Sequence, residues 1–180
     1  MVNLPNSVTA VRILLIPVFM FFLLNSNLQP FGSYVAAAIF SLAALTDTID
    51  GYLARFQKQV TAMGQFLDPI ADKLLVSAAL VSLVELARIS AWVALIIIAR
   101  EFAVSGLRLA AIAEKEVIVA SRWGKTKTIS QIVAVIAVIL QPPVELGGVT
   151  LASGLLALAV VLTVISGVDY FFKSWRVLTR

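Results

Sequence analysis

The sequence contains no cysteine and no histidine. The absence of cysteine excludes a disulfide, a thiolate nucleophile and a thiolate metal site. The absence of histidine excludes a Ser/His/Asp triad, a phosphohistidine intermediate and a histidine-ligated zinc ion. Acid–base chemistry and metal binding must therefore be carried out by carboxylates, lysine, tyrosine or water.

Charged residues are also scarce. They make up 13% of the 180 residues, whereas 61% are hydrophobic and the mean hydropathy is +1.00. Soluble domains average roughly 25% charged and 45–50% apolar residues, so the composition indicates a polytopic membrane protein. The net charge of +4 does not indicate nucleic-acid binding, because no basic stripe is interleaved with aromatic residues.

Six continuous apolar segments predict an all-α protein with six transmembrane helices in one bundle. A membrane admits only helices or closed barrels, and the alternating pattern of a barrel strand is missing. The predicted spans cover residues 8–24, 33–54, 66–87, 90–112, 126–142 and 149–172, in a single domain over 1–180.

The distribution of lysine and arginine predicts the orientation of these spans. One side collects eleven cations and the other has Arg88 alone, with Lys73 and Arg100 inside spans. By the positive-inside rule, both termini and the connections between spans two and three and between spans four and five face the cytoplasm. The eleven are Arg12, Arg55, Lys58, Arg108, Lys115, Arg122, Lys125, Lys127, Lys173, Arg176 and Arg180.

Four aspartates lie in the second and third spans. Asp47 and Asp50 precede the connection, and Asp68 and Asp72 follow it. Residues three or four apart share a helix face, so each pair lines up and the two pairs can converge on one site. An unpaired carboxylate inside a membrane costs about 2.5 kcal/mol or more. Oxygen ligands of this kind suit Mg²⁺ or Mn²⁺, which predicts a divalent-metal site.

Small residues and one arginine accompany the aspartates. Gly51 and Gly64 remove side chains where another group approaches the backbone closely. Ala54 is small on the same side as Gly51, and Arg55 offers a donor fork suited to phosphate. Taken alone, each has an ordinary structural explanation, but the joint spacing favours a phosphate-bearing ligand beside the metal.

The pattern Asp-x-x-Asp-Gly-x-x-Ala-Arg, eight residues, Gly-x-x-x-Asp-x-x-x-Asp over 47–72 resembles the signature of the CDP-alcohol phosphotransferases. These are membrane enzymes that transfer a substituted phosphoryl group from a CDP-linked donor to an alcohol. The resemblance implies that Asp47, Asp50 and Asp68 ligate a pair of divalent ions and that Asp72, also at the metals, is the general base. It also implies that Gly51, Ala54, Arg55 and Gly64 contact the cytidine and diphosphate of the donor.

A second motif bears on the acceptor alcohol. Arg-Glu-Phe-x-x-Ser-Gly-Leu-Arg over 100–108 and Gly-Lys-x-Lys-Thr over 124–128 resemble the phosphatidylglycerophosphate synthase branch. That resemblance implies CDP-diacylglycerol as donor, glycerol 3-phosphate as acceptor, and phosphatidylglycerol phosphate and CMP as products. Arg100, Arg108, Lys125 and Lys127 are the predicted acceptor-phosphate residues, although the two lysines alone also fit ordinary cytoplasmic charge. Glu101 is expected to pair with a neighbouring arginine.

Other features are less specific. Asn6 and Thr9, in an opening segment that also resembles the family, are predicted to help bind the donor. The sequence does not determine the oligomeric state; the resemblance suggests a homodimer, because homodimers occur in that family. Tyr34, Trp92, Trp123, Tyr170 and Trp175 lie near predicted span ends, as interfacial aromatics do.

Two alternative functions remain open. Another acceptor would give a cardiolipin synthase, a phosphatidylserine synthase or a phosphatidylinositol-phosphate synthase of the same fold. A cation transporter could also bury four carboxylates, but transport would predict acids spread over several spans and an internal repeat.

Overall fold

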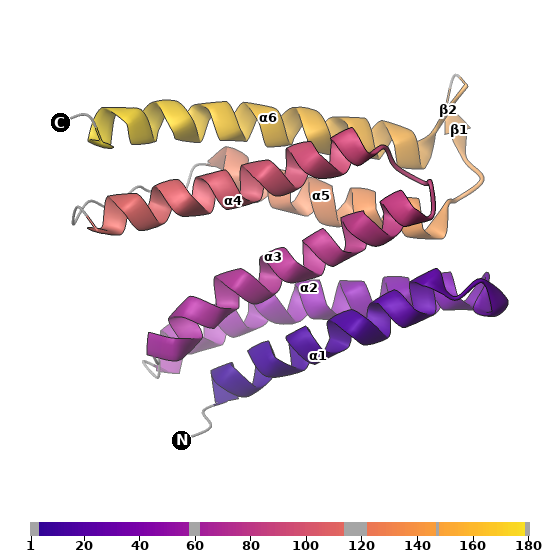
Figure 1. Ribbon diagram of the computed structural model, residues 1–180, viewed down its shortest axis with the longest axis horizontal. Coiled ribbons are helices and arrows are strands. Elements are labelled where there is room, and N and C mark those ends of the chain that lie inside the picture. The colour runs from indigo at the N-terminus through magenta and orange to yellow at the C-terminus, as the bar shows by residue number, and fades with distance from the viewer. Residues whose placement is uncertain (1–3, 58–61, 114–121, 147, 179–180) are drawn as a thin grey trace. The chain divides into compact units, whose positions relative to one another are not determined.

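The computed structural model describes residues 4–57, 62–113, 122–146 and 148–178 (Figure 1). Within these ranges, side chains are described except at 4–9, 47–57, 62–69, 72, 112–113, 122–123, 146 and 175–178. The described elements are α1 (Leu4–Leu24), η1 (Ser26–Leu28), α2 (Phe31–Gln57), α3 (Ala62–Glu85), α4 (Ala91–Ala113), α5 (Arg122–Leu140), β1 (Glu145–Leu146), β2 (Val149–Thr150) and α6 (Leu151–Leu178). The predicted all-α class is therefore confirmed. The chain divides into two compact units, residues 1–89 and 90–180.

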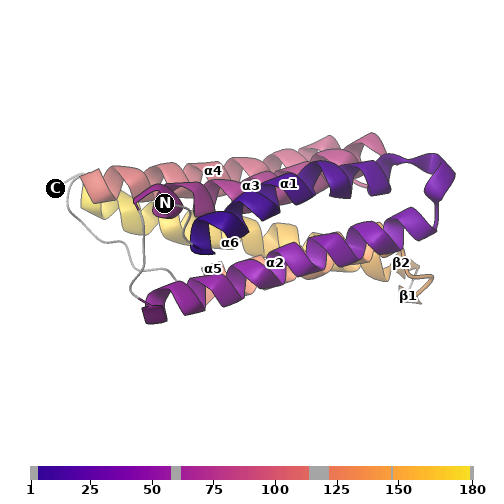
Figure 2. The ribbon, with the colours of Figure 1, turned by 90° about the horizontal axis from the view of Figure 1, so that it is seen from below.

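In the first unit, α1 packs against both α2 and α3 (Figures 1 and 2). Large apolar side chains fill these contacts: Phe19 and Leu23 of α1, Phe40 of α2 and Leu80 of α3 are fully buried. The rings of Phe19 and Phe40 lie 5.9 Å apart between centroids in a tilted arrangement. Burial of such side chains contributes roughly 1.5–3 kcal/mol each when the reference state is water.

The connection between α1 and α2 is held by side-chain hydrogen bonds. Gln29 Nε2 donates to the carbonyl oxygen of Leu23 at 3.0 Å, and Ser33 Oγ donates to Gln29 Oε1 at 2.5 Å. Gly32 lies so close to α1 that a Cβ atom would fall 2.3 Å from the carbonyl oxygen of Phe22. Only glycine fits here without moving one of the two helices.

At its C-terminal end, α3 closes with a left-handed residue. Ala87 has φ 54°, and the N–H of Arg88 donates to the carbonyl oxygen of Leu83 at 2.9 Å. The N–H of Ala87 donates to Val84 at 2.9 Å, which completes a Schellman motif. Burial lowers the pKa of Arg88, but a guanidinium stays charged throughout the physiological pH range.

In the second unit, α6 packs against both α4 and α5. Ser90 Oγ accepts the N–H of Trp92 at 3.3 Å and so caps the start of α4. Thr150 Oγ1 accepts the N–H of Ser153 at 3.3 Å and caps α6. Between α5 and α6 lies an antiparallel hairpin that the sequence did not predict, with Glu145 paired to Thr150 and Leu146 to Val149. Gly148 supplies the positive φ, 81°, that a two-residue hairpin loop needs.

The observed helices differ from the predicted spans mainly at their ends. Helix α5 begins at Arg122 and ends at Leu140, whereas the hydropathy predicted 126–142. Its first turn is polar and escapes a hydropathy criterion, and Pro142 and Pro143 cannot continue a helix. Helix α6 continues to Leu178, beyond the predicted residue 172, and α3 ends at Glu85 rather than 87.

Among the described residues, one segment is both long and apolar enough to cross a membrane, Leu151–Ser174. Two shorter apolar segments are Ala10–Leu24 and Phe31–Thr46. Large apolar side chains are nevertheless exposed on several other helices, among them Leu14, Leu42, Trp92, Phe102 and Ile129. Exposed apolar surface of this extent calls for an apolar environment or a partner.

Candidate active site

The four predicted metal-site aspartates lie on two helices of the first unit. Asp47 and Asp50 belong to α2, and Asp68 and Asp72 belong to α3. The predicted donor residues Gly51, Ala54 and Arg55 are on α2, and Gly64 is on α3. The side chains of all eight residues lie outside the described part of the chain.

The backbone places the two acid pairs at matching heights. Asp50 lies seven residues before the end of α2, and Asp68 lies six residues after the start of α3. At 1.5 Å per residue, both are about 10 Å from the connection, and Asp47 and Asp72 are both about 15 Å from it. The five Cα steps from Gln57 to Ala62 span at most about 19 Å. The two helix ends are therefore close, as Figure 1 also shows.

The carboxylate ligands of the aspartate motif suit a divalent cation. Four carboxylates supply only hard oxygen ligands, the kind that Mg²⁺ and Mn²⁺ prefer. No group of three or more acidic side chains was found among the residues whose side chains are described, a set that excludes all four aspartates. The family to which the motif points generally uses divalent metal ions.

Helix α1 brings further predicted residues to the same unit. Asn6 and Thr9 lie near its start, and their side chains are outside the described set. Arg12 follows one turn later and is only 3% exposed. In Figure 1 the start of α1, the end of α2 and the start of α3 lie at the same end of the first unit.

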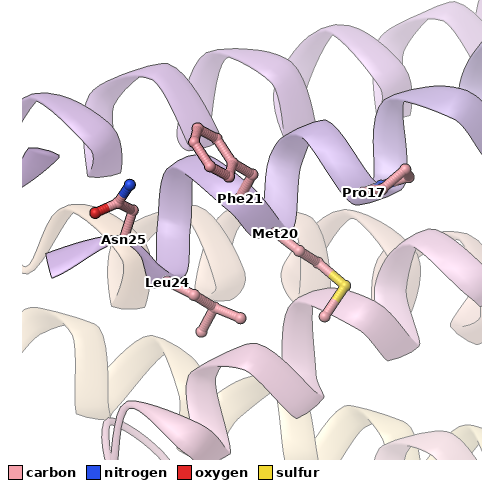
Figure 3. Close-up of a pocket in the computed structure, with 5 residues that line it drawn as sticks. All are labelled: Pro17, Met20, Phe21, Leu24 and Asn25. Carbon is pink, nitrogen blue, oxygen red and sulfur yellow. The ribbon is translucent and has the colours of Figure 1, made fainter.

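A hollow of about 470 Å³ lies elsewhere on α1 (Figure 3). Its lining is Pro17, Met20, Phe21, Leu24 and Asn25. Met20 is eleven residues from Thr9, or about 16 Å along the helix. The hollow offers a single polar side chain and no titratable group, so it carries no chemistry of the predicted kind.

The second unit contains a cluster of charged side chains. Glu101 of α4 accepts hydrogen bonds at its Oε1 atom from Lys127 Nζ of α5 and from Arg100 Nη1, the latter at 3.4 Å. The side chains of Lys127, Arg100 and Glu101 are 3%, 13% and 20% exposed. The expected pairing of Glu101 with an arginine is confirmed, and the pairing with Lys127 is an addition that the sequence did not predict.

Neutral polar groups extend this cluster to α6. Arg100 Nη2 donates to Ser166 Oγ at 3.0 Å. Gly167 lies beside the Arg100 side chain, where a Cβ on the glycine would fall 3.1 Å from Arg100 Cγ. Gln131 Nε2 of α5 donates to Thr163 Oγ1 of α6 at 2.8 Å. Polar contacts thus join all three helices inside the second unit, where unsatisfied groups would be costly.

Arg108 lies eight residues beyond Arg100 and also reaches α6. Its guanidinium carbon is 6.0 Å from the centroid of the Tyr170 ring, a cation–π contact. Tyr170 is 3% exposed, so it is not the interfacial aromatic residue that the sequence suggested. That expectation failed because α6 continues beyond its predicted end. Tyr34 and Trp92, at 62% and 73% exposed, fit the expected pattern.

Lys125 differs from the other three predicted acceptor residues. It lies two residues before Lys127 on α5, and a separation of two places side chains on opposite sides of a helix. Lys127 is buried against Glu101, whereas Lys125 is exposed. The structure thus brings Arg100 and Lys127 together, places Arg108 about 12 Å further along α4, and leaves Lys125 on the surface.

Sequence reasoning missed several members of the cluster. Ser166, Gly167, Gln131 and Thr163 lie in apolar runs and have no motif around them. The polarity of Ser166, Gln131 and Thr163 inside apolar runs could have indicated that they have polar partners, because a membrane-embedded polar side chain needs one. Their partners come from other helices, so spacing along the chain cannot identify them.

The comparison with known protein families agrees with the aspartate motif. Residues 2–165 match the CDP-alcohol phosphatidyltransferase family. The chain belongs to this family, and the family resemblance predicted from residues 47–72 is confirmed. The protein is therefore an enzyme of the phosphatidyltransferase class.

Curated relatives match along nearly the whole chain. A CDP-diacylglycerol–glycerol-3-phosphate 3-phosphatidyltransferase of Bacillus subtilis (strain 168) is 46% identical, with 99% of this chain and 98% of the relative covered. A protein of the same name from Pseudomonas fluorescens is 40% identical over 96% of this chain and 90% of the relative. A probable phosphatidylglycerophosphate synthase of Mycobacterium tuberculosis (strain ATCC 25618 / H37Rv) is 41% identical over 97% and 82%.

Proposed function

We propose that this protein transfers the phosphatidyl group of CDP-diacylglycerol to glycerol 3-phosphate, giving phosphatidylglycerol phosphate and CMP. One observation carries the proposal. A chain with the complete aspartate motif is 46% identical, end to end, to a relative with that named activity. Two cations of the second unit, the buried Lys127 and the partly buried Arg100, add groups suited to an acceptor that carries its own phosphate.

In this proposal, Asp47, Asp50 and Asp68 hold the divalent metal, with Asp72 beside them. A divalent ion bound there supplies charge neutralisation for the diphosphate and for the CMP leaving group. The proposed ion is Mg²⁺ or Mn²⁺, and the proposed site holds two ions. The donor contacts are assigned to Gly51, Ala54, Arg55, Gly64, Asn6 and Thr9.

The proposed reaction is a single displacement at one phosphorus atom of the donor. The hydroxyl oxygen of glycerol 3-phosphate attacks the phosphorus that carries the diacylglycerol, and the bond from that phosphorus to CMP breaks. Asp72 takes the hydroxyl proton as general base. Direct in-line attack is favoured over a covalent intermediate, because the only candidate nucleophiles beside the metal are aspartates with other roles.

The acceptor phosphate is assigned to Arg100, Arg108, Lys125 and Lys127. Arg100 and Lys127 are the inner pair, since their side chains are 13% and 3% exposed. Arg108 is exposed at its position on α4 and has its guanidinium fixed over Tyr170. Lys125, exposed on α5, adds long-range attraction for an anion rather than a buried contact.

We further propose that the six helices span the cell membrane, with both termini and the aspartates on the cytoplasmic side, and that the enzyme forms a homodimer. The helices have 19–28 residues, enough to cross about 30 Å of hydrocarbon. Because the chain has no cysteine, single cysteines introduced at Val149 and Lys173 can be labelled selectively. An impermeant reagent applied to intact cells should label the cysteine at position 149 and not the one at position 173; the reverse result would invert the topology.

Cross-linking in native membranes tests the proposed homodimer. Recovery of monomer alone would refute it.

The activity is tested by CMP release from CDP-diacylglycerol by the detergent-purified protein with Mg²⁺. Glycerol 3-phosphate is compared with phosphatidylglycerol, serine and inositol phosphate, and EDTA is the control. Turnover with glycerol 3-phosphate alone, abolished by EDTA, would support the proposal. Turnover with another acceptor would leave the metal site standing and would refute the acceptor assignment.

A further inference from the structure

Two arginines of α4 turn towards one face of α6, which packs beside it (Figure 1). Arg100 reaches Ser166 Oγ, and Arg108 lies over the ring of Tyr170. Ser166 and Tyr170 are four residues apart, so they share a face of α6 and are separated by about 6 Å along its axis. The two arginines are eight residues, or about 12 Å, apart on α4. A single turn of α6 therefore contacts two arginines that lie two turns apart.

The guanidinium of Arg108 is held by its charge and not by its hydrogen-bond donors. Its Cζ atom lies 6.0 Å from the centroid of the Tyr170 ring, and within the described part of the chain Arg108 forms no ion pair and no side-chain hydrogen bond. Arg100, in contrast, donates to Glu101 and to Ser166. A cation–π contact uses no N–H group. The donor fork of Arg108 is therefore left for a ligand, and such a fork suits bidentate binding of a phosphate.

The ring of Tyr170, and not its hydroxyl group, is the part that acts on Arg108. Tyr170 is 3% exposed, and its hydroxyl oxygen is buried with no hydrogen-bond partner among the described residues. A buried hydroxyl without a partner costs stability. Arg108 itself is exposed, and a long exposed side chain samples many rotamers unless a contact restrains it. The buried ring supplies that restraint.

We propose that Tyr170 is a positioning residue for the acceptor phosphate. Its ring keeps the Arg108 guanidinium beside α6 and leaves the N–H donors of that guanidinium for the phosphate. Tyr170 acts through Arg108 and does not contact the reacting atoms. The inference rests on the proposed function, because it takes glycerol 3-phosphate as the acceptor and Arg108 as one of its phosphate ligands.

The test measures KM for glycerol 3-phosphate and for CDP-diacylglycerol separately in the full-length protein. Tyr170→Leu removes the ring and should raise the acceptor KM about fivefold, equivalent to about 1 kcal/mol. The donor KM and kcat should stay within about twofold, because only binding of the acceptor is weakened. Tyr170→Phe keeps the ring and should restore the acceptor KM to within about twofold of the wild-type value. The matched control is Phe172→Leu, which removes a ring that is 66% exposed on the same helix and should change neither KM.

A double substitution tests whether Tyr170 acts through Arg108. Arg108→Ala should raise the acceptor KM by itself, and adding Tyr170→Leu should cause no further rise, because the ring then has no cation to hold. Two increases that multiply would overturn the proposal. An increase in Tyr170→Phe equal to that in Tyr170→Leu would also overturn it, because the hydroxyl group would then be the part in use.

A fluorinated ring decides the question if Tyr170→Leu does not fold. A trifluorinated phenylalanine at position 170 keeps the shape of the ring but withdraws electron density from its face, which weakens the attraction for a cation. An acceptor KM higher than that of Tyr170→Phe supports the inference, and an equal value overturns it.

Failure of the inference is distinguishable from failure of the proposed function. An unchanged acceptor KM in Arg108→Ala overturns the role of Arg108 and this inference with it, whereas turnover of glycerol 3-phosphate by the wild-type enzyme keeps the proposed reaction. If the wild-type enzyme shows no saturable use of glycerol 3-phosphate, the proposed function fails at that step, before any variant is compared.

Discussion

The two units bury their polar groups in different ways. In the first unit the described buried polar residues are Arg12, Ser33 and Ser82, one on each of its three helices. In the second unit Lys127, Gln131, Thr163 and Ser166 are buried and connected by ion pairs and hydrogen bonds across α4, α5 and α6. The buried polar side chains of the second unit thus have partners on neighbouring helices.

The aspartates of the first unit pose the opposite problem. In the proposed function the four carboxylates of α2 and α3 converge on one site, where they would repel one another and need a positive partner. In the proposed function that partner is a divalent ion together with its substrate. The two units therefore differ in the partners of their charges: in the proposed function the aspartates need a bound cation, whereas Arg100 and Lys127 already share a carboxylate of the protein.

The largest expected effect comes from the first unit. Asp68→Asn removes one proposed metal ligand, and CMP release should fall at least about 100-fold, equivalent to about 2.7 kcal/mol in the activation free energy. Thermal stability in detergent should be unchanged or increased, since carboxylate repulsion is relieved. Glu145→Gln, at an exposed carboxylate of the hairpin, is the control and should retain full activity. Full activity in Asp68→Asn would remove this aspartate from the site.

In the second unit, substitution of either partner of the buried ion pair should reduce stability. Lys127→Met or Glu101→Gln alone should lower the free energy of unfolding by on the order of 2 kcal/mol, because each substitution removes one partner of a largely buried, charged hydrogen bond. The double substitution should cost about 1 kcal/mol or more less than the sum of the two. Strictly additive losses, measured by thermal unfolding in detergent, would show that the two charges do not interact.

The packing of the first unit can be disturbed without changing any charge. Gly32→Ala places a methyl group 2.3 Å from the carbonyl oxygen of Phe22, so α1 and α2 must separate. We expect a loss of about 2 kcal/mol in the free energy of unfolding. Gly106→Ala, where a Cβ would meet no atom within 4 Å, is the matched control. Equal stability of the two variants would contradict the close approach of the helices.

The smallest effect compares two glycines of α6. Gly154→Ala meets nothing within 4 Å and should stabilise the helix by about 0.5–1 kcal/mol. Gly167→Ala would press on Arg100 Cγ at 3.1 Å and should lose that gain. The Tm of the Gly154 variant should be higher by about 2–4 °C. Indistinguishable Tm values would indicate that Arg100 is not confined by α6.

The family of the protein could be predicted from residues of the first unit, whereas the contacts of the second unit could not. The spacing from Asp47 to Asp72 identified the family, because the motif lies in one short stretch whose residues share helix faces. Hydropathy also predicted six helices. It misplaced the start of α5, where the turn containing Arg122 and Lys125 is polar, and it did not predict the hairpin around Gly148.

The contacts of the second unit could not have been predicted in the same way. Glu101 was expected beside an arginine, which local spacing can suggest, but Lys127 lies 26 residues away on another helix. Tyr170 was expected to be an interfacial aromatic residue near the end of a span, yet its ring is buried beneath Arg108. Such contacts depend on how helices pack, which no pattern within one helix determines.

The central claim is that glycerol 3-phosphate receives the phosphatidyl group. The most direct measurement is mass spectrometry of the lipid formed from CDP-diacylglycerol and isotopically labelled glycerol 3-phosphate by the purified enzyme with Mg²⁺. The account predicts a labelled phosphatidylglycerol phosphate in amounts equal to the CMP released. CMP release with no label in the lipid, or a labelled product only when another alcohol is supplied, would contradict it.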